Sequence, residues 1–165
     1  THGQLHPEIL ALASQSDSTV HAGDVGHPDV LTQLLKVSGN LVVVRGNNDT
    51  PSKWPAEAAK QLSQLPIQTQ LQLPGGQLAV EHGDRVNPAA QRHTLLRKRH
   101  PGARLILYGH SHRQAIDDTQ IPWVVNPGAA GRNRTYGGAA CISLTISNRR
   151  WQLKAHRYSL ADWTT

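Results

Sequence analysis

The chain has 165 residues, the length of one domain and enough to bury a hydrophobic core. Its 17 Lys and Arg against 11 Asp and Glu give a net charge of +6, which favours anionic partners such as phosphate esters or nucleic acid. The single cysteine excludes an internal disulfide framework, and the lack of a long apolar run excludes a membrane span. We expect a soluble, cytoplasmic protein with one domain over residues 1–165.

Helical and extended patterns alternate in the first part of the chain. Apolar residues at helical spacing predict two helices, and short apolar runs predict two strands. In chain order these are a helix from Pro7 to about Gln15, a strand from Ser18 to Ala22, a helix from Pro28 to Val37 and a strand from Leu41 to Val44. Each strand ends on a polar loop that contains Gly-Asp or Gly-Asn.

The second part of the chain contains more strands. The predicted elements are a hairpin of strands from Ile67 to Leu73 and Gln77 to Glu81, a basic helix from Ala89 to His100, a strand from Leu105 to Tyr108, and strands near Trp123–Val125, Ala140–Ile146 and Trp151–Arg157. Parallel strands first and meandering strands later predict an α/β fold, in which two mixed sheets pack face to face with helices outside.

Polar side chains follow four of the predicted strands. These residues are Asp24, Asn47, His82 and the pair His110 and His112. Because ligands gather at the carboxyl ends of strands in such sheets, we expect these side chains to converge. Oxygen from Asp and Asn together with nitrogen from His suits Mn²⁺, Ni²⁺, Zn²⁺, Fe or Co better than Ca²⁺ or Mg²⁺. The sequence therefore predicts a transition-metal site, and the presence of 10 His in the chain agrees with it.

Five motifs, in this order, resemble those of the calcineurin-like metallophosphoesterases, in particular their small bacterial and archaeal phosphodiesterase branch. The motifs are Thr1-His2-Gly3, Gly23-Asp24-Val25-Gly26-His27, Gly46-Asn47-Asn48-Asp49, His82-Gly83-Asp84 and Gly109-His110-Ser111-His112. The resemblance covers essentially the whole chain and implies an α/β/β/α sandwich.

The resemblance also implies a site with two divalent metal ions, for which manganese is our first expectation. In the family pattern, one metal is bound by His2 and His112, the other by Asn47, His82 and His110, and Asp24 bridges them. The implied activity is hydrolysis of a small phosphodiester by in-line attack of a hydroxide held by two metals.

The chain departs from the family pattern in two places. The first family motif is Asp-x-His, and its Asp would stand before Thr1. Since the chain has no Met and no strand before Thr1, we expect that the natural N-terminal strand is missing from this sequence.

The second departure is at Asn48. Many relatives have a His at this position, although the small phosphodiesterase branch tends to lack it. Asn donates a hydrogen bond but no proton at neutral pH. Asn48 and Asp49 are the candidate catalytic residues of this loop, and the source of the leaving-group proton stays open.

Charged residues beside the motifs are further candidates. Arg45, Arg85 and Arg113 could bind phosphate through a bidentate fork, although neighbouring strand positions point to opposite faces. Asp49 and Asp84 could orient metal-bound imidazoles. The histidines without motif support, and His27 at a helix start, are expected to be ordinary polar residues.

Two other functions are compatible with the sequence. The fold also resembles the scaffold subunit of retromer, in which the site serves partner binding, and Asn48 and the absent Asp favour this alternative. The presence of all six candidate ligands favours an enzyme. The basic charge permits nucleic-acid binding, but 4 Trp, 3 Tyr and no Phe offer little stacking surface. The sequence leaves the physiological substrate and the oligomeric state open.

Overall fold

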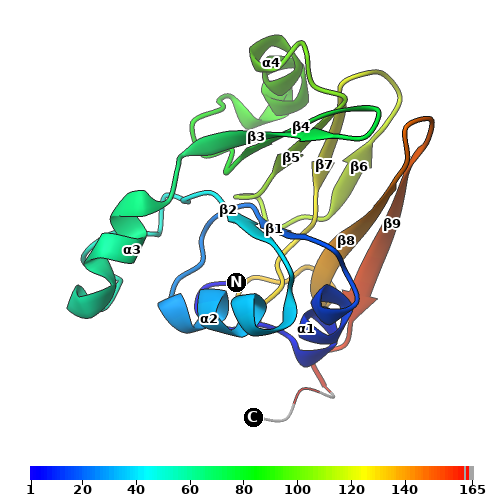
Figure 1. The fold of residues 1–165 in the computed structure, drawn as a ribbon. Coiled ribbons are helices and arrows are strands. Elements are labelled where there is room, and N and C mark those ends of the chain that lie inside the picture. The colour runs from blue at the N-terminus through cyan, green and yellow to red at the C-terminus, as the bar shows by residue number, and fades with distance from the viewer. Residues whose placement is uncertain (162, 164–165) are drawn as a thin grey trace.

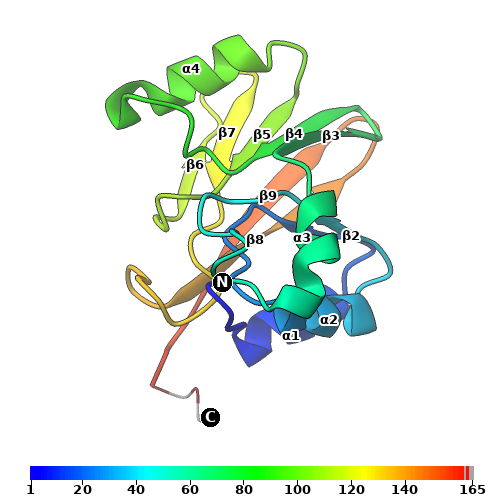
Figure 2. The same ribbon diagram turned by 90° about the vertical axis from the view of Figure 1, so that its left-hand side faces the viewer.

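The computed structural model describes residues 1–161 and 163 and arranges them in four layers (Figure 1). Helix α4 (Arg92–Arg99) covers one face of a five-stranded sheet, and a second layer of strands lies against the other face. Helices α1 (Pro7–Ser14) and α2 (Pro28–Val37) lie on the far side of this second layer, as the turned view in Figure 2 also shows. The architecture is the α/β/β/α sandwich that the sequence predicts.

The five-stranded sheet places the ends of its parallel strands at one edge. Its strand order is β3-β4-β5-β7-β6, with β4, β5 and β7 parallel and the two outer strands antiparallel to their neighbours. The bounds are β3 Gln68–Leu73, β4 Gly76–Glu81, β5 Leu105–Tyr108, β6 Ala115–Asp117 and β7 Trp123–Asn126. At this edge, the predicted ligand His82 directly follows β4, and His110 follows β5 after one glycine.

The second layer consists of two strand pairs in the described part of the chain. Strands β1 (Thr19–His21) and β2 (Leu41–Val43) are parallel, whereas β8 (Ala139–Ile146) and β9 (Trp151–Tyr158) form a long antiparallel hairpin. A cavity of about 990 Å³ is lined by apolar side chains of β1, β5 and β8, and Asp24 and His112 also line it. The expected single second sheet is thus divided, and the cavity between its two parts extends to the predicted ligands.

Three apolar clusters hold the layers together. Strand β5 shows how one strand serves two of them, since successive side chains of a strand point to opposite faces. Ile106 packs with Leu96 of α4, whereas Leu105 packs with Trp151 of β9 between the two strand layers. The third cluster, which includes Val30 of α2, lies under α1 and α2. Burial on both faces explains why the β5 sequence is continuously apolar.

Two histidines outside the predicted site cap helices. The side chain of His6 accepts a hydrogen bond from the backbone N–H of Glu8, and His27 accepts one from Asp29. Each His precedes a proline at the first helical position, where a missing N–H costs nothing. The expectation that His27 is not a ligand is consistent with this capping role.

Three short elements were not predicted, and one predicted helix needs correction. The additional elements are a 3₁₀ turn with the short helix α3 (Ala56–Ala58 and Ala59–Gln64) and strand β6. Helix α3 buries Leu62 alone, so it has no apolar periodicity to detect. The predicted helix from Ala89 to His100 is a 3₁₀ turn (Ala89–Gln91) followed by α4.

The helices among the described residues are all too short or too polar to cross a membrane.

Candidate metal centre

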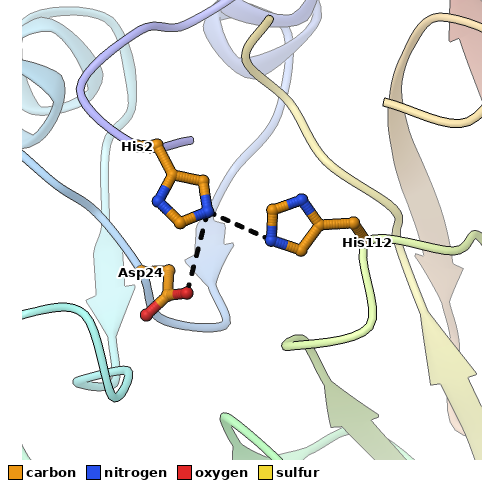
Figure 3. A group of neighbouring side chains, drawn as sticks. All are labelled: His2, Asp24 and His112. Atoms are coloured by element: carbon orange, nitrogen blue, oxygen red, sulfur yellow. Dashed lines mark hydrogen bonds and ion pairs between the residues drawn. The ribbon is translucent and has the colours of Figure 1, made fainter. Parts of the chain in front are cut away.

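Three predicted ligands lie together beyond the ends of β1 and β5 (Figure 3). His2, Asp24 and His112 each turn one potential ligand atom toward the others, all within 4.8 Å of one another. The Nε2 atoms of His2 and His112 are 3.1 Å apart, and Nε2 of His2 is 3.7 Å from Oδ2 of Asp24. We call these three residues the first cluster.

The other predicted ligands, Asn47, His82 and His110, form a second cluster. The Oδ1 atom of Asn47 lies 3.2 Å from Nε2 of His82 and 3.2 Å from Nδ1 of His110. The three residues follow β2, β4 and β5, so the two strand layers both contribute to this cluster. One amide oxygen therefore faces two imidazole nitrogens.

Asp24 contacts both clusters with different oxygens of its carboxylate. Its Oδ1 is 3.3 Å from Nε2 of His82, while its Oδ2 faces His2. Asn48 holds this orientation, because its backbone N–H donates to Oδ1 at 2.9 Å and its side-chain amide donates to Oδ2 at 2.8 Å. The structure thus has Asn48, a candidate catalytic residue, positioning the Asp24 carboxylate.

Backbone carbonyls orient two of the imidazoles. The ring Nδ1–H of His82 donates to the Ala22 carbonyl at 2.7 Å, and that of His112 donates to the Asn133 carbonyl at 3.2 Å. Such a bond places the proton on Nδ1 and leaves the Nε2 lone pair of a neutral ring free. In both residues, Nε2 is the atom that faces the cluster.

Three of the imidazoles are kept neutral at pH 7. Burial lowers the pKa of His2 to about 4 and also lowers the pKa values of His110 and His112. The neighbouring His82 adds to this effect at His110, and the Arg134 guanidinium adds to it at His112. Neutral imidazole is the form that binds metal ions.

The contact between Asp24 and His82 shifts both residues toward their charged forms. Burial alone would raise the pKa of Asp24, but hydrogen bonds from His82 and Asn48 outweigh it and hold the pKa well below its usual range. Burial alone would lower the pKa of His82, but the Asp24 carboxylate outweighs it and raises the pKa. A carboxylate that stays ionised at neutral pH is available to bind cations.

Asp49 joins the two loops that carry Asp24 and Asn47. Its buried carboxylate accepts backbone N–H groups of Val25 and Gly26 at 3.2 and 3.0 Å and of Gly46 at 2.9 Å. The indole N–H of Trp54 donates to it at 3.2 Å. Asp49 therefore fixes loop backbones, which corrects our expectation that it orients an imidazole.

The backbone of the site is confined to an uncommon conformation. Five non-glycine residues among those described have φ between +50° and +65°, where side chains are disfavoured. They are His2 (52°), Asp24 (54°), His110 (63°), His112 (59°) and Arg134 (52°). Four are predicted ligands and the fifth contacts two of them, so the strained positions coincide with the candidate site.

Glycine is required where the loops meet most closely. A Cβ atom at Gly46 would lie 2.3 Å from Oδ1 and from the backbone nitrogen of Asp24. No side chain fits at that distance, so the Gly-Asn motif allows the β2 loop to reach the Asp24 carboxylate.

The three arginines predicted to bind phosphate do not reach the predicted ligands. Arg113 stacks on Tyr136, with its guanidinium carbon 4.3 Å from the ring centre. The side chain of Arg85 is 61% exposed, and its Nε lies 4.0 Å from Asp84. Among the described residues, no hydrogen bond or ion pair joins Arg45, Arg85 or Arg113 to either cluster. The Asp84 carboxylate pairs with Arg85, and no hydrogen bond or ion pair within the described part of the chain joins it to an imidazole.

Arg134 is the guanidinium that the sequence analysis missed. Its Nη2 lies 3.3 Å from Nε2 of His2 and 3.2 Å from Nε2 of His112. It belongs to the loop between β7 and β8, whose glycines and arginines are visible in the sequence but follow no periodic pattern. It lies well beyond the end of β7, so the pattern of polar residues after strands did not point to it.

Asn126 is a second residue that supports the site without having been singled out in the sequence. It is fully buried at the end of β7, and its side-chain amide donates to the Gly109 carbonyl at 2.6 Å and to Ser111 Oγ at 3.0 Å. Asn126 therefore holds the loop that supplies His110 and His112.

The donor set fits a divalent metal ion. When His2 and His112 are neutral, two nitrogens and one carboxylate oxygen converge in the first cluster, and such electron-rich atoms repel one another unless a cation lies between them. The nitrogen and oxygen donors match divalent transition metals such as Mn²⁺, Zn²⁺ and Ni²⁺.

Comparison with known proteins agrees with this chemistry. Residues 1–149 match the model of the family described as the calcineurin-like phosphoesterase superfamily domain. A probable metallophosphoesterase of Methanocaldococcus jannaschii is 31% identical over 117 residues, which are 70% of this chain and 54% of that protein. The chain thus spans about half the length of this relative.

Solved structures share the fold. Zinc-complexed Vps29 of Entamoeba histolytica has a TM-score of 0.69 at 13% identity, with 94% of this chain and 90% of that chain covered. An archaeal phosphodiesterase has a TM-score of 0.65 at 17% identity, with coverage of 90% and 88%. A Thermotoga maritima protein, TM1076, has a TM-score of 0.65 at 22% identity, with coverage of 93% and 88%. With the family match over residues 1–149, the chain belongs to the calcineurin-like phosphoesterase superfamily.

Proposed function

We propose that this protein is a phosphodiesterase that uses two divalent metal ions. The observation that carries the proposal is the orientation of the Asp24 carboxylate. Its Oδ1 faces His82, and its Oδ2 faces His2. A carboxylate in this position can serve two cations at once. His2 and His112 would hold one ion, and Asn47, His82 and His110 would hold the other.

When bound, two such ions would activate water, orient the phosphate and neutralise its charge. The protein keeps Asp24 ionised. Hydrogen bonds from Nδ1 to backbone carbonyls orient the His82 and His112 rings so that Nε2 faces the site. Hydrolysis forms a bond from a water oxygen to phosphorus, while the bond to the alcohol oxygen on the opposite side breaks. The water supplies the proton that the departing alcohol needs.

A diester is the substrate class that this site favours. Asn48 stands where many relatives have a histidine, and its amide is already engaged with Asp24. Without an imidazole there, substrates with acidic leaving alcohols should suffer least. The fold shared with an archaeal phosphodiesterase is consistent with this proposal.

Manganese remains our first expectation for the metal, and zinc is the second because the Entamoeba Vps29 structure contains it. The cytoplasmic location stays a prediction.

The test combines metal content with hydrolysis of an aryl phosphodiester. We expect the protein, supplied with Mn²⁺, Zn²⁺, Ni²⁺ or Co²⁺, to bind two ions per chain and to hydrolyse bis-p-nitrophenyl phosphate. Asp24→Ala should lose both ions and reduce activity on the order of 10³-fold. Asp118→Asn, at an exposed position outside both clusters, is the matched control.

The rival function is a scaffold with a weak or inactive site, as the fold shared with Vps29 permits. The same experiment separates the two. If metal binds but Asp24→Ala and His110→Ala leave diester hydrolysis unchanged, or if no metal yields any hydrolysis, the enzyme proposal fails.

A further inference from the structure

The Arg134 side chain is exposed, yet it lies against the first cluster. One nitrogen of its guanidinium is within hydrogen-bond distance of two imidazole nitrogens, from His2 and His112. A guanidinium has donors only, so each Nε2 that it bonds acts as an acceptor. Arg134 is thus a permanent positive charge at the solvent-exposed side of the site.

The loop that carries Arg134 is fixed to the site by two further contacts. The carbonyl of Asn133 accepts the Nδ1–H of His112, so consecutive residues of the loop approach opposite sides of one imidazole ring. Tyr136 in the same loop stacks under Arg113, which follows His112 in the chain. These contacts hold the loop against the site, so the position of the guanidinium does not depend only on the rotamer of a surface side chain.

The backbone of Arg134 supports the same conclusion. Its φ is +52°. Among the described non-glycine residues, only four predicted metal ligands also have a positive φ. An arginine gains nothing from this conformation locally, and such strain persists where the surrounding structure requires it. The loop continues into Gly137 and Gly138, both with positive φ, which allow the chain to turn back into β8.

We propose that Arg134 binds a non-bridging oxygen of the substrate phosphate, an inference that rests on the proposed function and assigns its phosphate-binding residue. When the Nε2 atoms of His2 and His112 bind a cation, the guanidinium loses these acceptors. A phosphate group held beside the same atoms offers oxygen acceptors in their place. Planar, charge-assisted bonds from arginine to phosphate are among the strongest hydrogen bonds in proteins.

The experiment compares Arg134→Gln and Arg134→Lys with the wild type. Binding of inorganic phosphate to the manganese-supplemented protein is measured by calorimetry, and metal content is measured alongside. For Arg134→Gln we expect phosphate affinity to fall by about 10- to 100-fold and KM for the diester to rise similarly. Arg134→Lys should recover part of both, and metal content should stay at the wild-type value. Arg149→Gln, in the exposed turn between β8 and β9, is the charge-matched control.

Two results would overturn the proposal. Phosphate affinity equal to that of the wild type in Arg134→Gln would show that the guanidinium does not contact the anion. Loss of metal in the same variant would show that Arg134 acts through the imidazoles. Failure of the proposed function appears differently, as an absence of diester hydrolysis by the wild type, and the phosphate titration remains readable in that case.

Discussion

The two clusters of the site are built by different means. The second cluster depends on the sheet. His82 directly follows β4, is buried, and donates a hydrogen bond to the carbonyl of Ala22, the residue after β1. The first cluster depends on loops, because His2 precedes α1 and His112 is held by the β7–β8 loop. Their charges differ too. In the second cluster, His82 forms an ion pair with the Asp24 carboxylate, whereas the first cluster faces the Arg134 guanidinium.

This difference teaches which parts of the site belong to the folded core. We expect the second cluster to persist without metal, because the strands fix it. The first cluster should depend on long-range loop contacts and on the cation that it binds. Three experiments test this comparison, from the largest expected effect to the smallest.

Asp49→Ala should have the largest effect because Asp49 joins loops of both clusters. Three backbone N–H groups and one indole N–H would lose a charged acceptor. We expect the free energy of unfolding to fall by about 3–4 kcal/mol. Urea denaturation of the metal-free protein measures this loss, and the exposed Asp118→Ala should change it by less than about 0.5 kcal/mol. A change as small as that of the control would contradict the role of Asp49.

His82→Ala and His112→Ala compare the clusters directly. Without metal, His82→Ala should lower the free energy of unfolding by about 2–3 kcal/mol, because it leaves a cavity and an unpaired buried carbonyl at Ala22. His112→Ala should cost about 1 kcal/mol, because its carbonyl partner, Asn133, is exposed and can bond to water. Equal losses in the same urea assay would end the distinction between a sheet-built and a loop-built cluster.

The smallest expected effect concerns the stability of the protein in acid. A hydrogen bond from Arg97 holds the pKa of Asp117 well below its usual value; burial opposes the shift, and His93 adds to it. His93 in turn contacts Tyr108, which precedes the His110 loop. Because the folded-state pKa is depressed, this stabilisation is present above about pH 4 and is lost as pH falls further.

We therefore expect the metal-free wild type to lose more stability than Asp117→Asn between about pH 5 and pH 3. At pH 7 the variant should be less stable by under about 1 kcal/mol, since the Asp117 side chain is 24% exposed. Parallel pH curves for the two proteins would remove Asp117 as a source of acid sensitivity.

Much of the fold follows from local sequence patterns. The helix from Pro28 to Val37 and the strand from Leu105 to Tyr108 have the predicted bounds, because apolar periodicity and an initial proline act within one element. Helix α3 and strand β6 were missed because they are short and bury few side chains. The division of the second strand layer also lay beyond the sequence patterns, since strand pairing joins segments far apart in the chain.

The sequence by itself identified most of the candidate metal ligands. A residue that follows a strand must lie at the end of that strand, so Asp24, Asn47 and His82 could be placed together from the order of elements alone. Only the tertiary structure decided that the Asp24 oxygens face different clusters, that Asp49 binds loop backbones, and that Arg134 approaches where Arg113 does not. These features depend on the course of long loops, whose conformation is set by contacts with distant residues and carries no periodic signal of its own.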